Sequence, residues 1–114
     1  MSNGHDIYKV VTYVTRGTDT DSLLECLRDV HVNRIGDYEN CMTVIPCIGT
    51  WQAGDDTHPH IGMPSSTVMA KENRIEFVCS GDDLRRIIST IRKNHPYEEP
   101  EIDVYPLADI RGIR

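Results

Sequence analysis

The 114-residue chain lacks several features that would assign it to a particular class of protein. No apolar run is long enough to span a bilayer. The first ten residues, MSNGHDIYKV, do not show the basic segment and following apolar segment of an export signal. Positive charge is also scarce, because 12 lysine and arginine residues face 18 acidic residues and give a net charge of -6. We therefore expect a cytoplasmic protein that binds neither nucleic acid nor membranes.

The cysteines show no pattern that indicates a metal site or a disulfide framework. The four of them are unevenly spaced and form no Cys-x-x-Cys pair: Cys26, Cys41, Cys47 and Cys79. In a chain without an export signal they are expected to be reduced and partly buried. Cys41 and Cys47 flank a segment with Pro46, and we interpret them as strand residues rather than as a redox pair.

The chain does have the composition of one globular domain, with 39% hydrophobic and 26% charged residues. Four segments are rich in β-branched and aromatic residues and predict strands. They are residues 7–15, residues 41–51 with an interruption at Pro46, residues 67–79, and residues 101–107. The third is either one long strand or two strands joined near residues 72–73.

Two segments have the spacing of amphipathic helices. The first is residues 21–30, with Thr18, Asp19 or Thr20 as the candidate N-cap. The second begins after Ser80, its candidate N-cap, and ends before Pro96, because the residue before a proline avoids the helical conformation. Its apolar positions follow the pattern i, i+3, i+4, i+7: Leu84, Ile87, Ile88 and Ile91.

The order strand, helix, strand, strand, helix, strand predicts an α+β, ferredoxin-like βαββαβ fold. We expect an antiparallel four-stranded sheet with two helices on one face. The stretch QAGDDTHPHIGMPSS would form an inserted loop or hairpin. We assign residues 1–114 to a single domain with a core of about residues 7–107. The other face of the sheet is expected to be open unless a partner covers it.

The segment DDTHPHIG offers ligands for a metal ion. Asp55, Asp56, His58 and His60 place two carboxylates and two imidazoles within six residues, a donor set that suits a divalent ion such as zinc or copper. His58 and His60 would point the same way in an extended segment, and Asp56 is the third candidate ligand. His5 could join them only through folding. The alternative is a solvated polar loop.

A second concentration of reactive groups lies in NHPYEEPEIDVYPL. Adjacent side chains in an extended segment point in opposite directions, so Glu98 and Glu99 cannot face each other across a substrate. His95 and Glu98 could form an acid–base pair, but no nucleophile accompanies them. We favour the interpretation that His95 caps the preceding helix and that Pro96 and Pro100 fix a corner. Trp51, the only tryptophan, is either an exposed contact residue or the anchor of the loop that follows it.

The ordered segments NRIGDYENC, GTW, HPHIG, RIEFVC and HPYEEPEIDVYPL resemble the signature of one family. They are similar to the small domain inserted in, and sometimes found apart from, the NGG-one-interacting-factor (Nif-three-like) proteins. The last segment is also similar to the C-terminal motif of the divalent-cation tolerance (CutA) family. The resemblance covers about residues 7–107. Two departures are His58-Pro59-His60 in place of Asn-Pro-aromatic and Ala53 in place of a proline.

The resemblance implies a PII/CutA-like fold and homo-oligomers formed through sheet edges and open sheet faces, with a trimer favoured and a dimer possible. It implies that the dinuclear metal ligands of full-length Nif-three-like proteins lie in flanking domains, outside the segment matched here. A hydrolase-like activity is therefore not carried over to this chain.

These observations lead us to expect a non-enzymatic, homo-oligomeric small domain that binds a small ligand, a metal ion or a partner protein. The candidate contact residues for a ligand or a second subunit are His95, Tyr97, Glu98, Trp51 and Tyr38. One alternative is a divalent-metal-binding protein that uses the loop of His58 and His60. The other is an enzyme with a site between subunits around His95 and Glu98.

Overall fold

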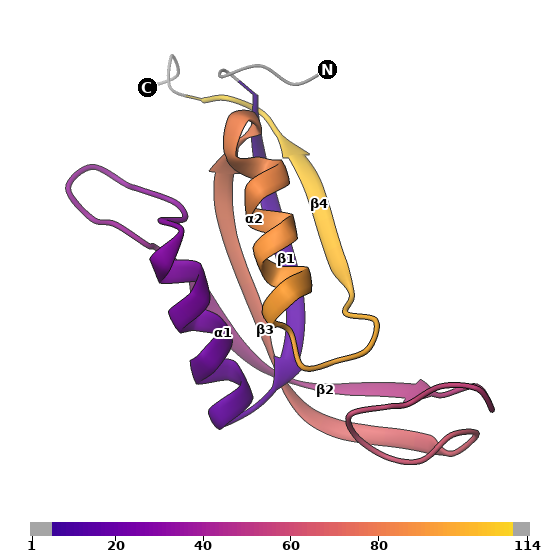
Figure 1. Ribbon diagram of the computed structural model, residues 1–114. Helices are drawn as coiled ribbons and strands as arrows, with labels where there is room; N and C mark the ends of the chain where they lie inside the picture. Colours follow the sequence, from indigo (N-terminus) through magenta and orange to yellow (C-terminus); the bar gives the residue numbers. More distant parts are fainter. Residues whose placement is uncertain (1–5, 111–114) are drawn as a thin grey trace.

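The computed structural model describes residues 6–110 and shows two helices lying across one face of a sheet (Figure 1). The elements follow in the order β1 (Ile7–Thr15), α1 (Thr18–Asp29), β2 (Thr43–Gln52), β3 (Thr67–Ser80), α2 (Gly81–Asn94) and β4 (Ile102–Leu107). The predicted α+β, ferredoxin-like arrangement is confirmed. β1 has the predicted bounds, and the third predicted strand is one continuous strand.

The sheet has the order β2-β3-β1-β4, and all neighbouring strands are antiparallel. β1 is central and pairs with β3 along its whole length, from Ile7 opposite Ser80 to Thr15 opposite Glu72. Its pairing with β4 ends earlier, at Thr12 opposite Ile102. The last three residues of β1 therefore extend beyond β4. On that side they have no neighbouring strand and face the segment that precedes β4.

The hydrophobic core lies between the two helices and the sheet. The apolar stripe predicted for the second helix points into it: Ile87 and Ile91 are fully buried, and Leu84 packs against them. Side chains from α1, β1 and β3 complete the core: Val10, Val14, Leu23, Leu27, Ile75, Phe77 and Cys79. Neither helix within residues 6–110 is long and apolar enough to cross a bilayer.

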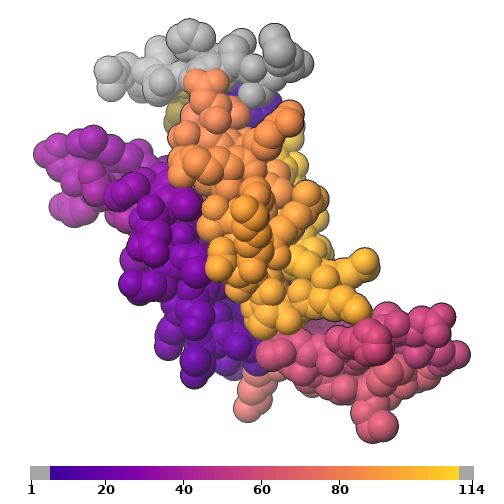
Figure 2. All heavy atoms as spheres, viewed as in Figure 1, coloured from indigo at the N-terminus to yellow at the C-terminus, as the bar shows by residue number. Residues whose placement is uncertain are grey.

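Beyond the end of β1, the distal halves of β2 and β3 continue as a two-stranded arm. We define the arm as residues 48–71, which comprise the ends of β2 and β3 and the segment that joins them. The arm projects away from the helices in the ribbon view and forms the pink lobe of the space-filling view (Figures 1 and 2). This is the predicted inserted hairpin, and its connecting segment carries His58 and His60.

The buried face of β3 changes where the arm joins the main sheet. In the arm the even-numbered residues Val68 and Ala70 are buried, and Glu72 continues this series, whereas the odd-numbered residues from Ile75 to Cys79 are buried in the main sheet. The pairing register with β2 and β1 continues through this point without an interruption. The two halves therefore bury opposite faces: the helices cover one, and the arm's own loop together with the segment before β4 covers the other.

The predicted N-cap of α1 is wrong, whereas the N-cap of α2 is Ser80, as predicted. α1 begins at Thr18 after Gly17, whose φ of 89° lies in the left-handed region that favours glycine. Thr20 instead donates its hydroxyl hydrogen to the carbonyl of Thr15 at 2.7 Å. Ser80 does occupy the N-cap position of α2, but its hydroxyl contacts the carboxylate of Asp83 at 3.2 Å rather than a backbone N–H. Neither helix therefore begins with a side-chain capping bond to a backbone N–H.

Candidate functional site

The segment between α2 and β4, residues 95–101, wraps around the free edge of β1, and we call it the corner. The imidazole Nε2 of His95 lies 2.7 Å from the carbonyl oxygen of Tyr13, one of the residues that extend beyond β4. The hydroxyl of Thr12 donates to the carbonyl of Glu101 at 2.7 Å. The corner therefore supplies hydrogen-bond partners that a longer β4 would otherwise provide.

The hydrogen bonds of His95 define its tautomer. The backbone N–H of Tyr97 donates to Nδ1 at 3.1 Å, so Nε2 carries the proton and donates it to Tyr13. The residue is only 8% exposed, and burial lowers the pKa of its imidazole. As predicted, His95 lies at the C-terminal end of α2. The bond that caps the helix comes from its backbone N–H, which donates to the carbonyl of Ile91 at 2.9 Å. Backbone groups occupy both ring nitrogens, so His95 makes no hydrogen bond to Glu98, the pairing considered above as an alternative.

The buried neutral His95 should make folding stability depend on pH. Its pKa is lowered from 6.5 in the folded state, so below about pH 6.5 the unfolded chain takes up a proton that the folded chain does not. The contribution of the neutral His95 to folding stability is complete above that pH. It is lost as the pH falls towards the pKa of His95 in the folded state. We expect chemical denaturation over about pH 5 to 8 to show a shallower acid loss for His95→Gln than for the wild type. A His58→Gln variant, altered at an exposed histidine, should keep the wild-type slope. Identical slopes for all three proteins would contradict this assignment.

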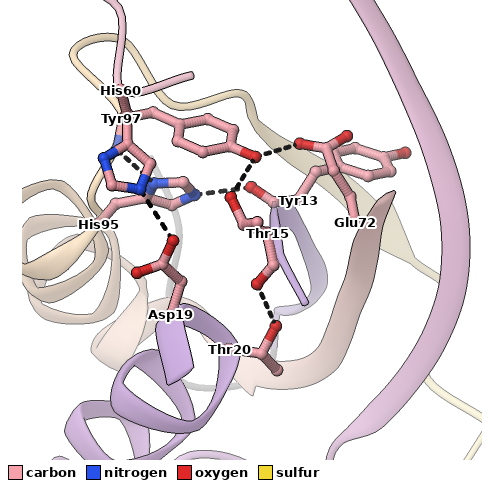
Figure 3. Close-up of polar contacts among 8 residues, drawn as sticks. All are labelled: Tyr13, Thr15, Asp19, Thr20, His60, Glu72, His95 and Tyr97. Carbon is pink, nitrogen blue, oxygen red and sulfur yellow. Dashed lines mark hydrogen bonds and ion pairs between the residues drawn. The ribbon is translucent and has the colours of Figure 1, made fainter. Parts of the chain in front are cut away.

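Tyr97 connects the corner to β3 through a buried carboxylate. Its hydroxyl donates to Oε2 of Glu72 at 2.6 Å and lies 3.0 Å from the hydroxyl of Thr15, which then acts as the donor (Figure 3). Glu72 is only 4% exposed. Burial and the neighbouring Glu72 raise the pKa of the Tyr97 hydroxyl, so it stays a hydrogen-bond donor at neutral pH. Gly49 of β2 lies against the same carboxylate, where a Cβ atom would overlap Oε1 and approach Cδ to 2.6 Å.

Tyr97 is also the centre of an aromatic cluster that draws the arm towards the corner. Its ring centroid lies 4.7 Å from that of His95, 5.8 Å from that of Trp51 and 5.9 Å from that of His60. His60 in turn reaches across to α1, where its Nε2 lies 2.9 Å from Oδ2 of Asp19 (Figure 3). This pair is partly exposed and contributes little stability by itself. It nonetheless fixes the arm's loop against the helical side of the molecule.

A pocket of about 550 Å³ lies between the arm and the corner. Its lining combines aromatic and acidic side chains: Tyr13, Trp51, His60, Tyr97, Glu72, Glu98, Glu99 and Glu101. Among the residues of 6–110 that line it, none is a lysine or an arginine. Cys47 also lines the pocket, and burial together with the charge of Glu72 raises the pKa of its thiol. Such a thiol is protonated and is not an activated nucleophile.

The structure brings together most of the predicted contact residues. Trp51, Tyr97 and Glu98 line the pocket, and His95 lies directly behind Tyr97. Tyr38 does not join them: it is 77% exposed and lies in the connection between α1 and β2. Trp51 is half-buried, lines the pocket and packs against the ring of Tyr97, and its role as a contact residue stays a prediction.

The predicted metal ligands are dispersed. His60 pairs with Asp19, and the backbone N–H of His58 donates to Glu98 at 3.1 Å. Asp56 is exposed and does not line the pocket. Within residues 6–110, no group of three or more histidine, cysteine, aspartate or glutamate side chains is arranged to hold a metal ion. His5 lies outside the described residues, and the binding of zinc or copper stays a prediction.

Sequence reasoning missed the residues at the floor of the pocket. The sequence indicates Glu72 only as a possible junction between two strands, and Gly49 only as the first residue of the segment GTW. The available signal was the alternation in β3, where a charged residue continues the buried series of Val68 and Ala70. A glutamate at a buried strand position needs a partner, and here the partner is Tyr97, 25 positions further along the chain.

The fold places the protein in the PII/CutA-like class of ferredoxin-like domains. It superposes on the structure of CutA from Synechococcus elongatus with a TM-score of 0.64, over 94% of this chain and 80% of that one. The two sequences are only 14% identical, so this similarity concerns the fold alone. The predicted PII/CutA-like fold is thereby confirmed.

Sequence similarity leads to a narrower group, the Nif-three-like proteins. The chain is 33% identical over 103 residues to a Halalkalibacterium halodurans protein named GTP cyclohydrolase 1 type 2 homolog, covering 90% of this chain and 27% of that protein. A Bacillus cereus protein related to NIF3 superposes with a TM-score of 0.78 and 27% identity, over 95% of this chain and 27% of that one. No family model matches the chain. The resemblance to the small domain of Nif-three-like proteins is confirmed, and the chain spans about a quarter of the length of these relatives.

Proposed function

We propose that this protein is a non-enzymatic, homo-oligomeric binding domain of the cytoplasm that holds a small ligand in the pocket between the arm and the corner. The observation that carries the proposal is how the pocket is built. The walls of the pocket come from β2, the loop that follows it, β3 and the corner. Part-buried hydrogen bonds from Tyr97 to Glu72 and from His95 to Tyr13 hold the corner against the sheet. A preformed cavity of about 550 Å³ with aromatic walls and a few fixed polar groups is typical of small-molecule sites.

The chemistry of the pocket favours binding over catalysis. The Cys47 thiol is protonated, the Tyr97 hydroxyl has a raised pKa, and backbone groups occupy both nitrogens of His95. The relatives' name refers to a GTP cyclohydrolase, but a triphosphate is bound through cations or clustered backbone N–H groups. Among the described residues that line this pocket, no lysine or arginine offers such a contact.

The edges of the sheet favour self-association. β2 and β4 are the outer strands, and an edge strand presents unpaired backbone groups to a second chain. β2 also exposes three large apolar side chains, Val44, Ile45 and Ile48. A trimer is the favoured assembly and a dimer is possible, with a partner protein as a further candidate for the same edge.

The proposal is tested by light scattering together with a thermal-shift screen of small cationic, neutral and anionic compounds. We expect a homo-oligomer at micromolar concentration and at least one compound that stabilises the wild type. Trp51→Ala, which removes a wall of the pocket, should abolish that stabilisation. Met69→Ala changes an exposed residue of the same arm and should preserve it. A strict monomer, or stabilisation that is indifferent to Trp51, would refute the proposal.

A further inference from the structure

We infer that the ligand of this pocket is a small organic cation, an amine or a guanidine, whose charged group lies between the Glu72 carboxylate and the rings of Trp51 and Tyr97. This inference rests on the proposed function and specifies the class of ligand. It follows from the charge of the lining, the unused oxygen of Glu72 and the arrangement of the aromatic side chains.

The charge of the lining is the first step of the argument. Four carboxylate side chains line the pocket, from Glu72, Glu98, Glu99 and Glu101. Among the described residues that line the pocket, His60 is the only one whose side chain can carry a positive charge. Its imidazole is already paired with the carboxylate of Asp19. The nearby Arg16 donates to the backbone carbonyls of Glu72 and Cys47 rather than to a carboxylate. The pocket therefore attracts a cation and repels an anion.

The second step concerns the two oxygens of Glu72. Oε2 accepts the hydroxyl hydrogen of Tyr97 at 2.6 Å. Within residues 6–110, no group donates a hydrogen bond to Oε1, and this oxygen is not among the buried atoms that lack a partner, so it is open to solvent although the residue as a whole is only 4% exposed. A buried carboxylate is stabilised when both oxygens have donors, and a charged donor gives the strongest bonds. An ammonium or guanidinium N–H in the pocket would replace solvent at Oε1 with a charged donor.

The aromatic side chains provide the third step. The ring centroids of Trp51 and Tyr97 are 5.8 Å apart with their planes inclined at 48°, and both side chains line the pocket. A cation near the face of a tryptophan or tyrosine ring is attracted by the ring's quadrupole, and more strongly when water is excluded. An amine or guanidine can use these faces and Glu72 together, and its carbon chain can fill the apolar part of the pocket.

A bare metal ion fits the same site less well. Within the described residues, the acidic side chains of the pocket do not form a group of three or more with the geometry of a metal site. A volume of about 550 Å³ also exceeds what one ion and its waters occupy, and Trp51 and Tyr97 offer an ion few ligands. An organic cation uses both the charge and the apolar surface.

The test is a series of three ligands of equal chain length: cadaverine, 1,5-pentanediol and glutarate, which are doubly positive, neutral and doubly negative. Trp51 is the only tryptophan, so its fluorescence reports directly on the pocket wall, and calorimetry gives the affinity independently. We expect saturable binding of cadaverine that weakens with added salt. Pentanediol and glutarate should bind at least about tenfold more weakly, because the diol offers Glu72 only an uncharged donor and glutarate has no donor and is repelled by the carboxylates.

Variants connect the binding to the proposed residues. Glu72→Gln keeps the shape of the side chain and an acceptor for Tyr97 but removes the charge, and we expect about a tenfold or greater loss of cadaverine affinity. Glu25→Gln makes the same chemical change on the exposed side of α1 and should bind like the wild type. Trp51→Leu, followed by calorimetry, should weaken cadaverine binding as well.

The outcomes separate the inference from the proposed function. Equal or tighter binding of glutarate or pentanediol that depends on Trp51 would overturn the cationic class while supporting a ligand pocket. Binding of a lysine-containing peptide without any binding of cadaverine would replace the small molecule with a protein partner. Absence of saturable cadaverine binding overturns the inference, and the independent thermal-shift screen then decides whether the pocket binds other compounds.

Discussion

Replacing Ile87 with alanine is expected to lower the free energy of unfolding by about 2–5 kcal/mol, the range found when a buried aliphatic side chain is truncated. Ile87 is fully buried, and its side chain belongs to the core between the helices and the sheet. Truncation removes apolar contacts and leaves a cavity between α2 and the sheet that closes only partly as neighbouring side chains relax. Urea denaturation followed by far-ultraviolet circular dichroism measures the change.

The control for this prediction is Met69→Ala in the arm. Met69 is 76% exposed, so its truncation should change the free energy of unfolding by less than about 0.5 kcal/mol. Comparable losses for the two variants would mean that the side chains between helices and sheet do not form the main core.

Replacing Gly49 with alanine is expected to have the largest effect on the pocket. The added Cβ atom would overlap the carboxylate of Glu72, which is buried and held by Tyr97, so the carboxylate must move. We expect a loss of about 1–3 kcal/mol in the free energy of unfolding from this overpacking. Binding in the pocket should be lost at the same time, since both Glu72 and the Tyr97 hydroxyl would be displaced. Denaturation and calorimetry on the same preparations measure the two effects.

Two further variants separate this cause from a general intolerance of glycine substitution. Gly54 lines the same pocket, but a Cβ atom there meets nothing within 4 Å, so Gly54→Ala should change stability by less than about 0.5 kcal/mol. In the double variant Gly49→Ala/Glu72→Ala the overlap is gone, so its cost should be smaller than the sum of the two single costs. Strictly additive costs would show that the alanine at residue 49 does not act through Glu72.

The pocket depends on where β4 begins. Because β4 pairs with β1 only as far as Thr12, the following three residues of β1 lack a strand on that side. The corner fills this gap with His95, and the same turn places Tyr97 against Glu72. Because β4 is short, the end of β1 needs hydrogen-bond partners from the corner. The same short strand leaves the space in which the aromatic cluster packs. The histidine and tyrosine of HPYEEP are therefore structural residues, and Tyr97 also lines the pocket.

The fold could be predicted from the sequence because its signals are local. The alternation of residues 7–15, the stripe of Ile87 and Ile91 and the helix-ending Pro96 each report on neighbours within a few positions, where side-chain direction follows from backbone geometry. The order of the elements then restricted the topology to one arrangement. The N-cap predicted for α1 is wrong because Gly17, with its positive φ, takes that position, and the hydroxyl of Thr20 donates to Thr15 at the end of β1.

The sequence by itself therefore determined the order of the elements, the buried stripe of α2 and the position of the corner. Only the tertiary structure decided which reactive groups meet. Tyr97 reaches Glu72 across 25 positions, and His60 reaches Asp19 across 41, so no local spacing encodes either contact. The loop of His58 and His60 thus became a wall of the pocket, and Glu72 became its floor. The physical reason is that periodicity specifies the face on which a side chain lies, whereas the partner it meets there depends on how distant segments pack.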